Sequence, residues 1–486
     1  MASIEEIRSE RLRKLVLLQE HGIDPYPSKI KRDFTLREVK EKFVELLEGV
    51  NTVAIAGRVM AIRGQGAIQF VVLNDGTATF QAVLKKDILG DAMQFFAATT
   101  DVGDFISVEG RLFETQRGEK SVEVVTWTMA SKSLRPLPEK WHGLQDVEEK
   151  LRKRYLDIMF DDELRELFVK KAKFWQSIRS FMINEGFLEV ETPVLETTTG
   201  GADARPFGTH HNALDIDVFL RISCGELWQK RLMVAGYEKV FEIGRIFRNE
   251  GMSPEHAQDY TQLEWYWAYA NYEDGMKFVE RMYKKVAEET FGTLQFKIGE
   301  FDVDLAKAWE RYDYTETIKK LADIDITTAT LEDIESALKR LKVVYDKKGW
   351  NRVRAIDNLW KFCRKQLSGP GFLVNVPVEM SPLAKLVSGK RIVEQFQPII
   401  AGSEVGKGYS ELNDPIDQAA RFQEQEKLRE DGDAEAQMYD RDFVEALEQG
   451  MPPTCGFGVS ERLFAFLANK PIRESQIFPL MRPKQN

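Results

Sequence analysis

A run of apolar residues that ends at Phe247 leads into charged and aromatic side chains whose alternation predicts a β-hairpin. In the segments 239–250 and 259–267, apolar and polar residues alternate with the period of two that a strand requires. Paired as antiparallel strands, they share a surface that carries Arg248, Glu250, Tyr260, Glu264 and Tyr266. A guanidinium, two carboxylates and aromatic rings suit a ligand with a phosphate, an amine and a ring. A half-exposed amphipathic hairpin with surface ion pairs explains the same pattern equally well.

A second group of chemical interest lies in the glycine-rich stretch IIAGSEVGKGYSELND, residues 399–414. If Lys407 and Gly408 form a two-residue hairpin loop, Glu404 lies directly opposite Glu411. Facing carboxylates repel each other across a ladder, and a cation that prefers oxygen ligands, such as Mg²⁺, would remove the repulsion. A solvated acidic turn that binds no metal is the alternative.

A third group lies in CGFGVSERLFAFL, residues 455–467, where glycines lead into a predicted helix that Ser460 caps. Arg462 then falls in the first helical turn, where the helix dipole disfavours a cation. A bound anion such as a triphosphate would offset this cost. The alternative is a surface arginine in a tolerated position.

The totals limit the class of protein that carries these groups. A chain of 486 residues with 43% hydrophobic and 30% charged residues predicts two or three globular domains. No uncharged apolar run is long enough to span a membrane, and the charged N-terminus does not resemble a signal peptide. The three cysteines form neither a disulfide framework nor a metal-binding spacing, which favours a cytoplasmic location. The net charge of −10 argues against a general nucleic-acid coat but allows a local basic face.

The pattern along the chain predicts an α/β multidomain protein. A charged helix over residues 3–21 begins an N-terminal extension, residues 1–50. Five short β-rich runs separated by Gly and Asp turns predict a small barrel, an OB-fold, over residues 51–136. A linker over residues 137–150 precedes a mixed α/β region, residues 151–486. That region contains a mostly helical insertion near residues 315–368, whose chemistry the sequence does not indicate.

Taken together, the three groups resemble motifs 2 and 3 of class II aminoacyl-tRNA synthetases and the acidic pair before motif 3. The segments GGADARPFGTHHNALD, FEIGRIFRNEG, GYSELNDPIDQAARF and FPLMRP resemble the bacterial type of lysyl-tRNA synthetase in particular. EGFLEVETPVL, with Pro193, resembles motif 1, which implies a homodimer. The resemblance implies an OB-fold anticodon-binding domain followed by a catalytic domain built on an antiparallel sheet flanked by helices.

On the nucleotide side, the resemblance implies an ATP-binding set of Arg248, Glu250, Tyr260, Glu404, Glu411 and Arg462. Arg248 would contact the α-phosphate and the substrate carboxylate, while Tyr260 would stack on adenine and Glu250 would orient it. Arg462 would cover the other face of adenine and reach the γ-phosphate. Glu404 and Glu411 would hold Mg²⁺, and the catalytic residues would be Arg248, Arg462 and Glu411.

The implied lysine-binding set is Gly201, Glu226, Glu264, Tyr266, Lys407 and Tyr409. Gly201 and Glu226 would receive the α-amino group, and Glu264 and Tyr266 the ε-ammonium. Tyr409 would line the side-chain slot. A lysine side chain needs a buried carboxylate partner because an unpaired buried ammonium is very costly, and Glu264 supplies one independently of the resemblance.

The implied reaction joins L-lysine and ATP as lysyl-adenylate and then transfers lysine to tRNA(Lys). In the barrel, Phe70 would stack on an anticodon base and Gln81 would hydrogen-bond it. A barrel-core role is the alternative for Phe70.

This chain departs from the family pattern in four places. Motif 3 is one residue short, and the segment before Glu226 is one residue longer. Glu255 stands where an arginine is expected, and Lys407 where an asparagine is expected. Three rival functions therefore remain: an aspartyl- or asparaginyl-tRNA synthetase, a related enzyme that lysylates a protein, and a non-catalytic nucleic-acid-binding protein.

Overall fold

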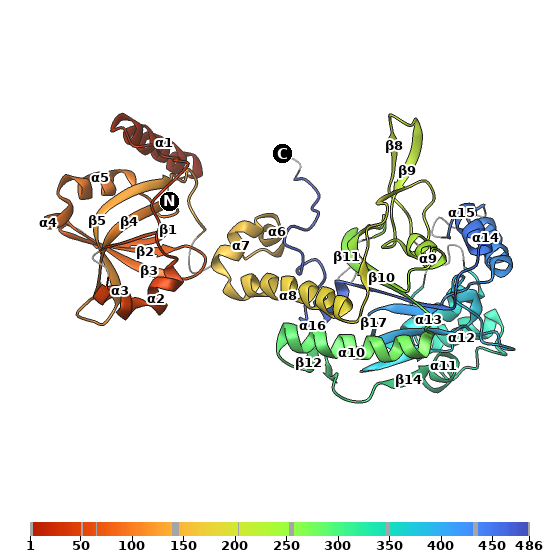
Figure 1. Ribbon diagram of the computed structural model, residues 1–486. Helices are drawn as coiled ribbons and strands as arrows, with labels where there is room; N and C mark the ends of the chain where they lie inside the picture. Colours follow the sequence, from red (N-terminus) through yellow and green to blue (C-terminus); the bar gives the residue numbers. More distant parts are fainter. Residues whose placement is uncertain are drawn as a thin grey trace. The chain divides into compact units, whose positions relative to one another are not determined.

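The computed structural model describes residues 3–49, 52–64, 66–138, 145–202, 204–251, 257–345, 350–430 and 436–484. The chain divides into two compact units, residues 1–162 and 163–486 (Figure 1). Glu255 and part of the predicted linker lie outside the described residues. Among the described residues, no helix combines the length and the apolar character needed to cross a bilayer.

The first unit is built around a closed five-stranded barrel with the strand order β1-β2-β3-β5-β4, which confirms the predicted barrel. Its strands are β1 (Val53–Arg63), β2 (Ile68–Asn74), β3 (Thr79–Lys85), β4 (Phe105–Glu114) and β5 (Lys120–Ser131). Alternate side chains point inward and are fully buried, as Val71 and Leu73 of β2 show. The unit also contains α1 (Ile4–Glu20), α2 (Leu36–Glu41), α3 (Phe43–Gly49), α4 (Lys86–Leu89), α5 (Asp91–Thr99), α6 (Val147–Arg152) and α7 (Arg154–Phe160).

The second unit is organised by a nine-stranded sheet in which β17 pairs with β16 beside the main order β14-β15-β16-β18-β19-β11-β10-β6. Most pairs are antiparallel, as the resemblance implies, and the pairs β14–β15 and β6–β10 are parallel. Its strands are β6 (Leu188–Glu189), β10 (Lys239–Phe247), β11 (Asp259–Ala268), β14 (Glu310–Asp313), β15 (Gly371–Val374), β16 (Gln395–Ile400), β17 (Ser403–Glu404), β18 (Lys407–Ser410) and β19 (Thr454–Ser460).

Two hydrophobic cores flank this sheet. One contains the sheet residues Phe241 and Trp265 together with side chains from α8 (Asp162–Asn184), α10 (Tyr272–Phe291) and α16 (Arg462–Leu467). The other contains Tyr266 and Tyr409 with side chains from α9 (Glu226–Val234), α11 (Tyr314–Ala322), α12 (Leu331–Arg340), α13 (Arg352–Arg364), α14 (Pro415–Glu430) and α15 (Arg441–Glu448). Figure 1 shows α10 running along the sheet. Helices thus cover both faces of the sheet.

Short elements complete the second unit. A three-stranded sheet consists of β7 (Leu195–Glu196), β9 (Ile216–Leu220) and β8 (Gly208–His211). A two-stranded ribbon consists of β12 (Gln295–Ile298) and β13 (Phe301–Asp304). A 3₁₀ turn, η1, spans Val378–Met380.

The hairpin predicted from the alternation forms, and its side chains lie on the predicted faces. Phe241 pairs with Trp265, and Glu242 pairs with Glu264. The aromatic pair is buried in the core under the sheet, so the carboxylate pair belongs to the opposite face. The strand period alone was sufficient to assign these faces.

The turn predicted at Lys407 and Gly408 is wrong. Both residues lie in β18, which pairs with β16 on one side and with β19 on the other. The two-residue loop is instead Ala401-Gly402, which joins Ile400 of β16 to Ser403 of β17. Both loop residues have positive φ, 48° and 72°, which is the conformation that a tight hairpin loop of this kind requires. Glu404 and Glu411 therefore do not face each other across a hairpin.

Candidate active site

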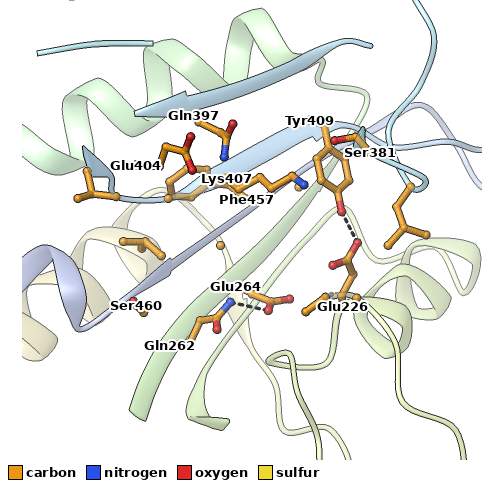
Figure 2. Close-up of a pocket in the computed structure, with 18 of the residues that line it drawn as sticks. Glu226, Gln262, Glu264, Ser381, Gln397, Glu404, Lys407, Tyr409, Phe457 and Ser460 are labelled. Carbon is orange, nitrogen blue, oxygen red and sulfur yellow. Dashed lines mark hydrogen bonds between the residues drawn. The ribbon is translucent and has the colours of Figure 1, made fainter. Parts of the chain in front are cut away.

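One cavity of about 350 Å³ lies on the face of the sheet that carries Glu264 and Tyr266 (Figure 2). It collects predicted residues that are up to 261 positions apart in the chain. Those that line it are Gly201, Glu226, Arg248, Tyr260, Glu264, Tyr266, Glu404, Lys407, Tyr409, Glu411 and Arg462. Glu250 does not line the cavity; it is half-buried beyond the end of β10.

Glu264 is a buried carboxylate on β11 that is held from several sides. Its Oε1 accepts hydrogen bonds from the backbone N–H of Cys224 and from Nε2 of Gln262, each at 2.7 Å. The hydroxyl of Tyr266 donates to its Oε2 at 3.3 Å. Burial raises the pKa of Glu264, and the nearby charge of Glu226 raises it further. A cationic ligand would stabilise the ionised form, because it would supply the missing opposite charge.

Glu226 opens α9 and faces Tyr409 across the cavity, and the Tyr409 hydroxyl donates to its Oε1 (Figure 2). Gly201 lies so close that a Cβ at this position would meet Oε2 of Glu226 at 2.9 Å and its Cβ at 2.7 Å. Any larger residue at 201 would therefore displace Glu226. A small polar group of a ligand could thus contact the carboxylate of Glu226 and the nearby backbone of Gly201 at the same time.

Lys230 was not singled out by the sequence analysis, yet its ammonium lies among these carboxylates. Its Nζ is 2.7 Å from Glu226 Oε1 and 2.5 Å from Glu411 Oε2, and the side chains of Lys230 and Glu411 are each only 1% exposed. Burial alone would lower the pKa of Lys230, but the two carboxylates outweigh it and raise the pKa. Lys230 thus already carries the counter-charge for Glu411.

Arg248 and Tyr260 form the end of the cavity near the hairpin loop. The Arg248 guanidinium lies 5.8 Å from the centre of the Tyr260 ring, and its Nε donates to the backbone carbonyl of Ile222 at 3.2 Å. Burial raises the pKa of the Tyr260 hydroxyl. A fixed guanidinium beside an aromatic face is suited to a phosphate joined to a flat ring.

Glu404 and Arg462 lie on the far wall and are linked through Ser403. The guanidinium of Arg462 donates to the Ser403 hydroxyl at 2.8 Å, and Trp360 donates its indole N–H to Oε1 of Glu404. Ser460 accepts the backbone N–H of Arg462 at 3.3 Å, but the residue at the cap position of α16 is Glu461. The predicted cap is therefore displaced by one residue.

Lys407 extends across the cavity from β18, and its side chain runs towards Tyr409 and Ser381 (Figure 2). Its Nζ lies 6.0 Å from the centre of the Tyr409 ring. The position that was expected to form a loop tip thus carries a cation into the cavity from the middle of the sheet.

Comparison with known proteins identifies the family of this arrangement. The family model for class II tRNA synthetases of the aspartate, lysine and asparagine type matches residues 146–482, and an OB-fold nucleic-acid-binding model matches residues 53–129. The chain belongs to the class II aminoacyl-tRNA synthetases. It is 42% identical to a lysine–tRNA ligase of Thermotoga maritima, over 99% of this chain and 97% of the relative. It is 44% identical to a lysine–tRNA ligase of Moorella thermoacetica, over 99% and 98%.

The barrel of this synthetase presents the two predicted anticodon residues on its strands. Phe70 of β2 is partly exposed and lies outside the barrel core, so the core alternative for it is wrong. Gln81 of β3 is half-buried and donates its amide to the Ser121 hydroxyl at 2.9 Å. Nearby, Lys85 of β3 and Glu123 of β5 form an ion pair at 2.5 Å.

The motif 1 segment of the synthetase leaves apolar side chains exposed. Pro193 is exposed, and so are Val194 at 43% and Leu195 at 47%. Leu188, earlier in the same segment, is 49% exposed. A contiguous apolar segment of this kind suits burial against another protein surface.

The sequence contains a local signal for Lys230, although this residue was not among those predicted for the site. Lys230 follows Glu226 by four positions on α9, the spacing at which opposite charges meet on a helix. No comparable local signal existed for Trp360, because its partner Glu404 lies 44 positions away. Cys224 is fully buried and donates its backbone N–H to Glu264.

Proposed function

We propose that this synthetase is a lysine–tRNA ligase, which activates L-lysine with ATP and transfers it to the 3′ end of tRNA(Lys). The relatives named lysine–tRNA ligase, which this chain matches over nearly its full length, support the proposal. The observation that carries it is the buried carboxylate of Glu264 on the cavity wall, beside Tyr266 and opposite Glu226.

Three buried carboxylates make the cavity selective for a cationic amino acid. The single ammonium of Lys230 contacts both Glu226 and Glu411, so it compensates only one of their two charges. Glu226 and Glu264 would therefore bind the two ammonium groups of lysine. An aspartate side chain would meet like charges at Glu226 and Glu264, and the neutral amide of asparagine would leave Glu264 without a counter-charge, which argues against the aspartyl and asparaginyl alternatives. Glu264 can still accept another hydrogen bond, because an ionised carboxylate has about four acceptor positions.

In the first step, an oxygen of the lysine carboxylate attacks the α-phosphorus of ATP, and the bond to pyrophosphate breaks. Arg248 would bind the α-phosphate and the carboxylate, which brings the reacting groups together and neutralises developing charge. Arg462 would hold the terminal phosphate, and Tyr260 would carry the adenine. In the second step, a terminal ribose hydroxyl of tRNA attacks the carbonyl of the adenylate, and AMP leaves.

The Mg²⁺ of this proposal fits Glu404 better than Glu411. Glu404 is half-buried on the wall beside Arg462 and has an indole N–H on one oxygen, whereas Glu411 is buried against the Lys230 ammonium. No three His, Cys, Asp or Glu side chains converge as a metal site in the described ranges. The phosphates of ATP would therefore supply further ligands, as is usual for Mg²⁺. When bound, the ion would neutralise phosphate charge.

Four further assignments belong to this proposal. The barrel would bind the anticodon through Phe70 and Gln81. The division into an extension, residues 1–50, a barrel domain, 51–136, a linker, 137–150, and a catalytic domain, 151–486, fits the two family matches. The exposed segment around Pro193 would form a homodimer interface, and the protein would work in the cytoplasm.

ATP–pyrophosphate exchange with each of the twenty amino acids tests the proposal. We expect lysine to support exchange far better than aspartate or asparagine, and tRNA charging to follow the same order. Exchange with aspartate alone would reassign the substrate. Exchange with lysine but transfer only to a protein would support the lysylating alternative, and no exchange at all would favour the non-catalytic one.

A further inference from the structure

Helix α13, in the helical segment that had no assigned chemistry, brings a side chain against Glu404, which lines the cavity. Trp360 of α13 is 2% exposed, and its indole N–H donates to Oε1 of Glu404. Its ring lies 5.0 Å from that of Tyr314 of α11 and packs in the core that covers this face of the sheet. Because the indole is fixed by this packing, the direction of its N–H is fixed as well.

The end of α13 also holds the loop that precedes Glu404. The guanidinium of Arg364 donates to the carbonyl of Gly402 at 2.6 Å and contacts the Ser403 hydroxyl at 3.3 Å. The backbone N–H groups of Ala401 and Gly402 donate to the carbonyls of Ser368 and Leu367, each at 2.8 Å. A Cβ at Gly402 would come within 3.0 Å of the Lys365 Cα, so the approach itself requires glycine.

The contacts made by α13 extend to both charged side chains on this wall of the cavity, Glu404 and Arg462. Ser403 accepts a hydrogen bond from Arg462 as well as from Arg364, and Glu404 is the next residue in β17. An indole N–H can only donate, so it engages one oxygen of Glu404 and leaves the other to a ligand. Partners that orient a ligating carboxylate in this way typically change metal affinity by about 10- to 100-fold when removed.

We propose that Trp360 is a positioning residue for the nucleotide: its indole N–H holds Glu404 towards the Mg²⁺–ATP complex. The helical segment α11–α13 then takes part in ATP binding, although none of its described residues lines the cavity. This inference rests on the proposed function, because it presumes that the wall around Glu404 and Arg462 binds ATP.

The test is Trp360→Phe, which keeps an aromatic ring in the core and removes the N–H donor. The matched control is Trp350→Phe in the same segment, because Trp350 donates to Glu335 at 2.8 Å and that carboxylate, unlike Glu404, does not line the cavity. We expect the W360F variant to bind Mg²⁺–ATP about 10-fold more weakly or worse in calorimetric titrations without lysine. The KM for lysine should stay within about twofold, and W350F should change neither quantity.

A double-mutant cycle separates positioning from a merely structural role. If Trp360 acts through Glu404, W360F should add almost nothing to the loss of Mg²⁺–ATP affinity already caused by Glu404→Ala. An undiminished effect of W360F in that background, or equal losses for ATP and lysine, would overturn the inference.

Fluorine NMR of the full chain with 5-fluorotryptophan gives a readout that does not depend on a folded variant of Trp360. Trp→Phe variants of the other eight of the nine tryptophans assign their signals, that of Trp350 included, and the signal that remains belongs to Trp360. Mg²⁺–ATP should shift the Trp360 signal and leave that of Trp350 in place; an unmoved Trp360 signal with bound nucleotide contradicts the inference. If ATP binding behaves as expected but lysine supports no exchange, the proposed amino acid is wrong and the role of Trp360 stands.

Discussion

The barrel and the catalytic sheet each contain a lysine–glutamate pair, and the two pairs differ mainly in their access to water. Lys85 and Glu123 on the barrel are 30% and 25% exposed, whereas Lys230 and Glu411 beside the catalytic cavity are each 1% exposed. Exposed pairs contribute little because water competes for both charges. Buried pairs depend on each other, since either partner alone would be an uncompensated charge in a low dielectric. The pair on the barrel is therefore open to water, whereas the pair in the catalytic unit is buried and keeps its charges only because both partners are present.

The largest effect should come from breaking the buried pair. Lys230→Met removes the ammonium at similar length and leaves Glu226 and Glu411 uncompensated, which should cost about 3–5 kcal/mol of stability. Calorimetry of the two units should show a clearly lower melting temperature for the catalytic unit. Lys85→Met on the barrel is the control, with a cost of about 0–1 kcal/mol. Equal shifts for both variants would remove the distinction.

Arg248→Ala tests whether the catalytic unit uses its fixed charges in the reaction. Loss of one group that stabilises transition-state charge typically lowers the rate by about 100- to 1,000-fold. We expect this loss in ATP–pyrophosphate exchange without a change in melting temperature. Arg245→Ala is the control, because Arg245 lies three residues earlier, on β10, and pairs with Asp259 at the surface. Exchange by R248A within a few-fold of the unmodified protein would remove Arg248 from the mechanism.

Glu264→Gln should weaken the binding of lysine much more than the binding of ATP. The substitution keeps the shape of the side chain and removes the charge that would pair with the ε-ammonium. A hydrogen bond to a charged group contributes about 1.5–3 kcal/mol, or about 10- to 100-fold in KM for lysine. A rise in KM for ATP alone would move Glu264 to the nucleotide side of the cavity.

Phe70→Ala should separate the barrel from the chemistry. Loss of one stacked base should weaken tRNA binding by about 1–3 kcal/mol while amino-acid activation continues at its normal rate. Charging assays and exchange assays on the same preparation measure the two quantities. Phe95→Ala is the control, since Phe95 packs against His21 and Trp127 rather than on the predicted anticodon face. Equal charging defects in both variants would indicate general damage to the barrel.

The affinity for lysine should increase with pH because Glu264 holds its proton more tightly than an ordinary carboxyl group. Burial and the charge of Glu226 raise its pKa, so lysine binding in the range between the ordinary and the raised pKa releases a proton. The Kd should fall by up to about tenfold per pH unit in that range. The free protein binds more protons folded than unfolded there, so this group makes the protein less stable as pH rises.

Titration calorimetry from pH 6 upwards, in buffers of different ionisation enthalpy, measures both the Kd and the proton released. E264Q is the control, because it should lose this pH dependence. A Kd for lysine that is flat or rises with pH would show that Glu264 is already ionised in the empty cavity.

The sequence predicted the barrel and the β10–β11 hairpin correctly because both depend on local alternation. Phe241 and Glu242 fall on opposite faces of β10 whatever the rest of the chain does. The turn predicted at Gly408 is wrong because a glycine also permits close packing inside a sheet. A Cβ at Gly408 would meet the carbonyl oxygen of Gly456 at 2.6 Å, a contact with a strand nearly fifty residues away. No local pattern reports a contact of that kind, and the same holds for Trp360 and Glu404.

The parallel pairing of β14 with β15 limits how this protein can be shortened. Glu310 of β14 lies beside Gly371 of β15, and the chain between the two strands contains α11, α12 and α13. Neighbouring parallel strands run in the same direction. The chain must therefore run back from the end of β14 to the start of β15, and a tight turn cannot make this connection. A deletion that joined these strands by a few residues would force β15 to reverse or to leave the sheet edge. Protein engineers can trim this crossover, but they cannot replace it with a hairpin.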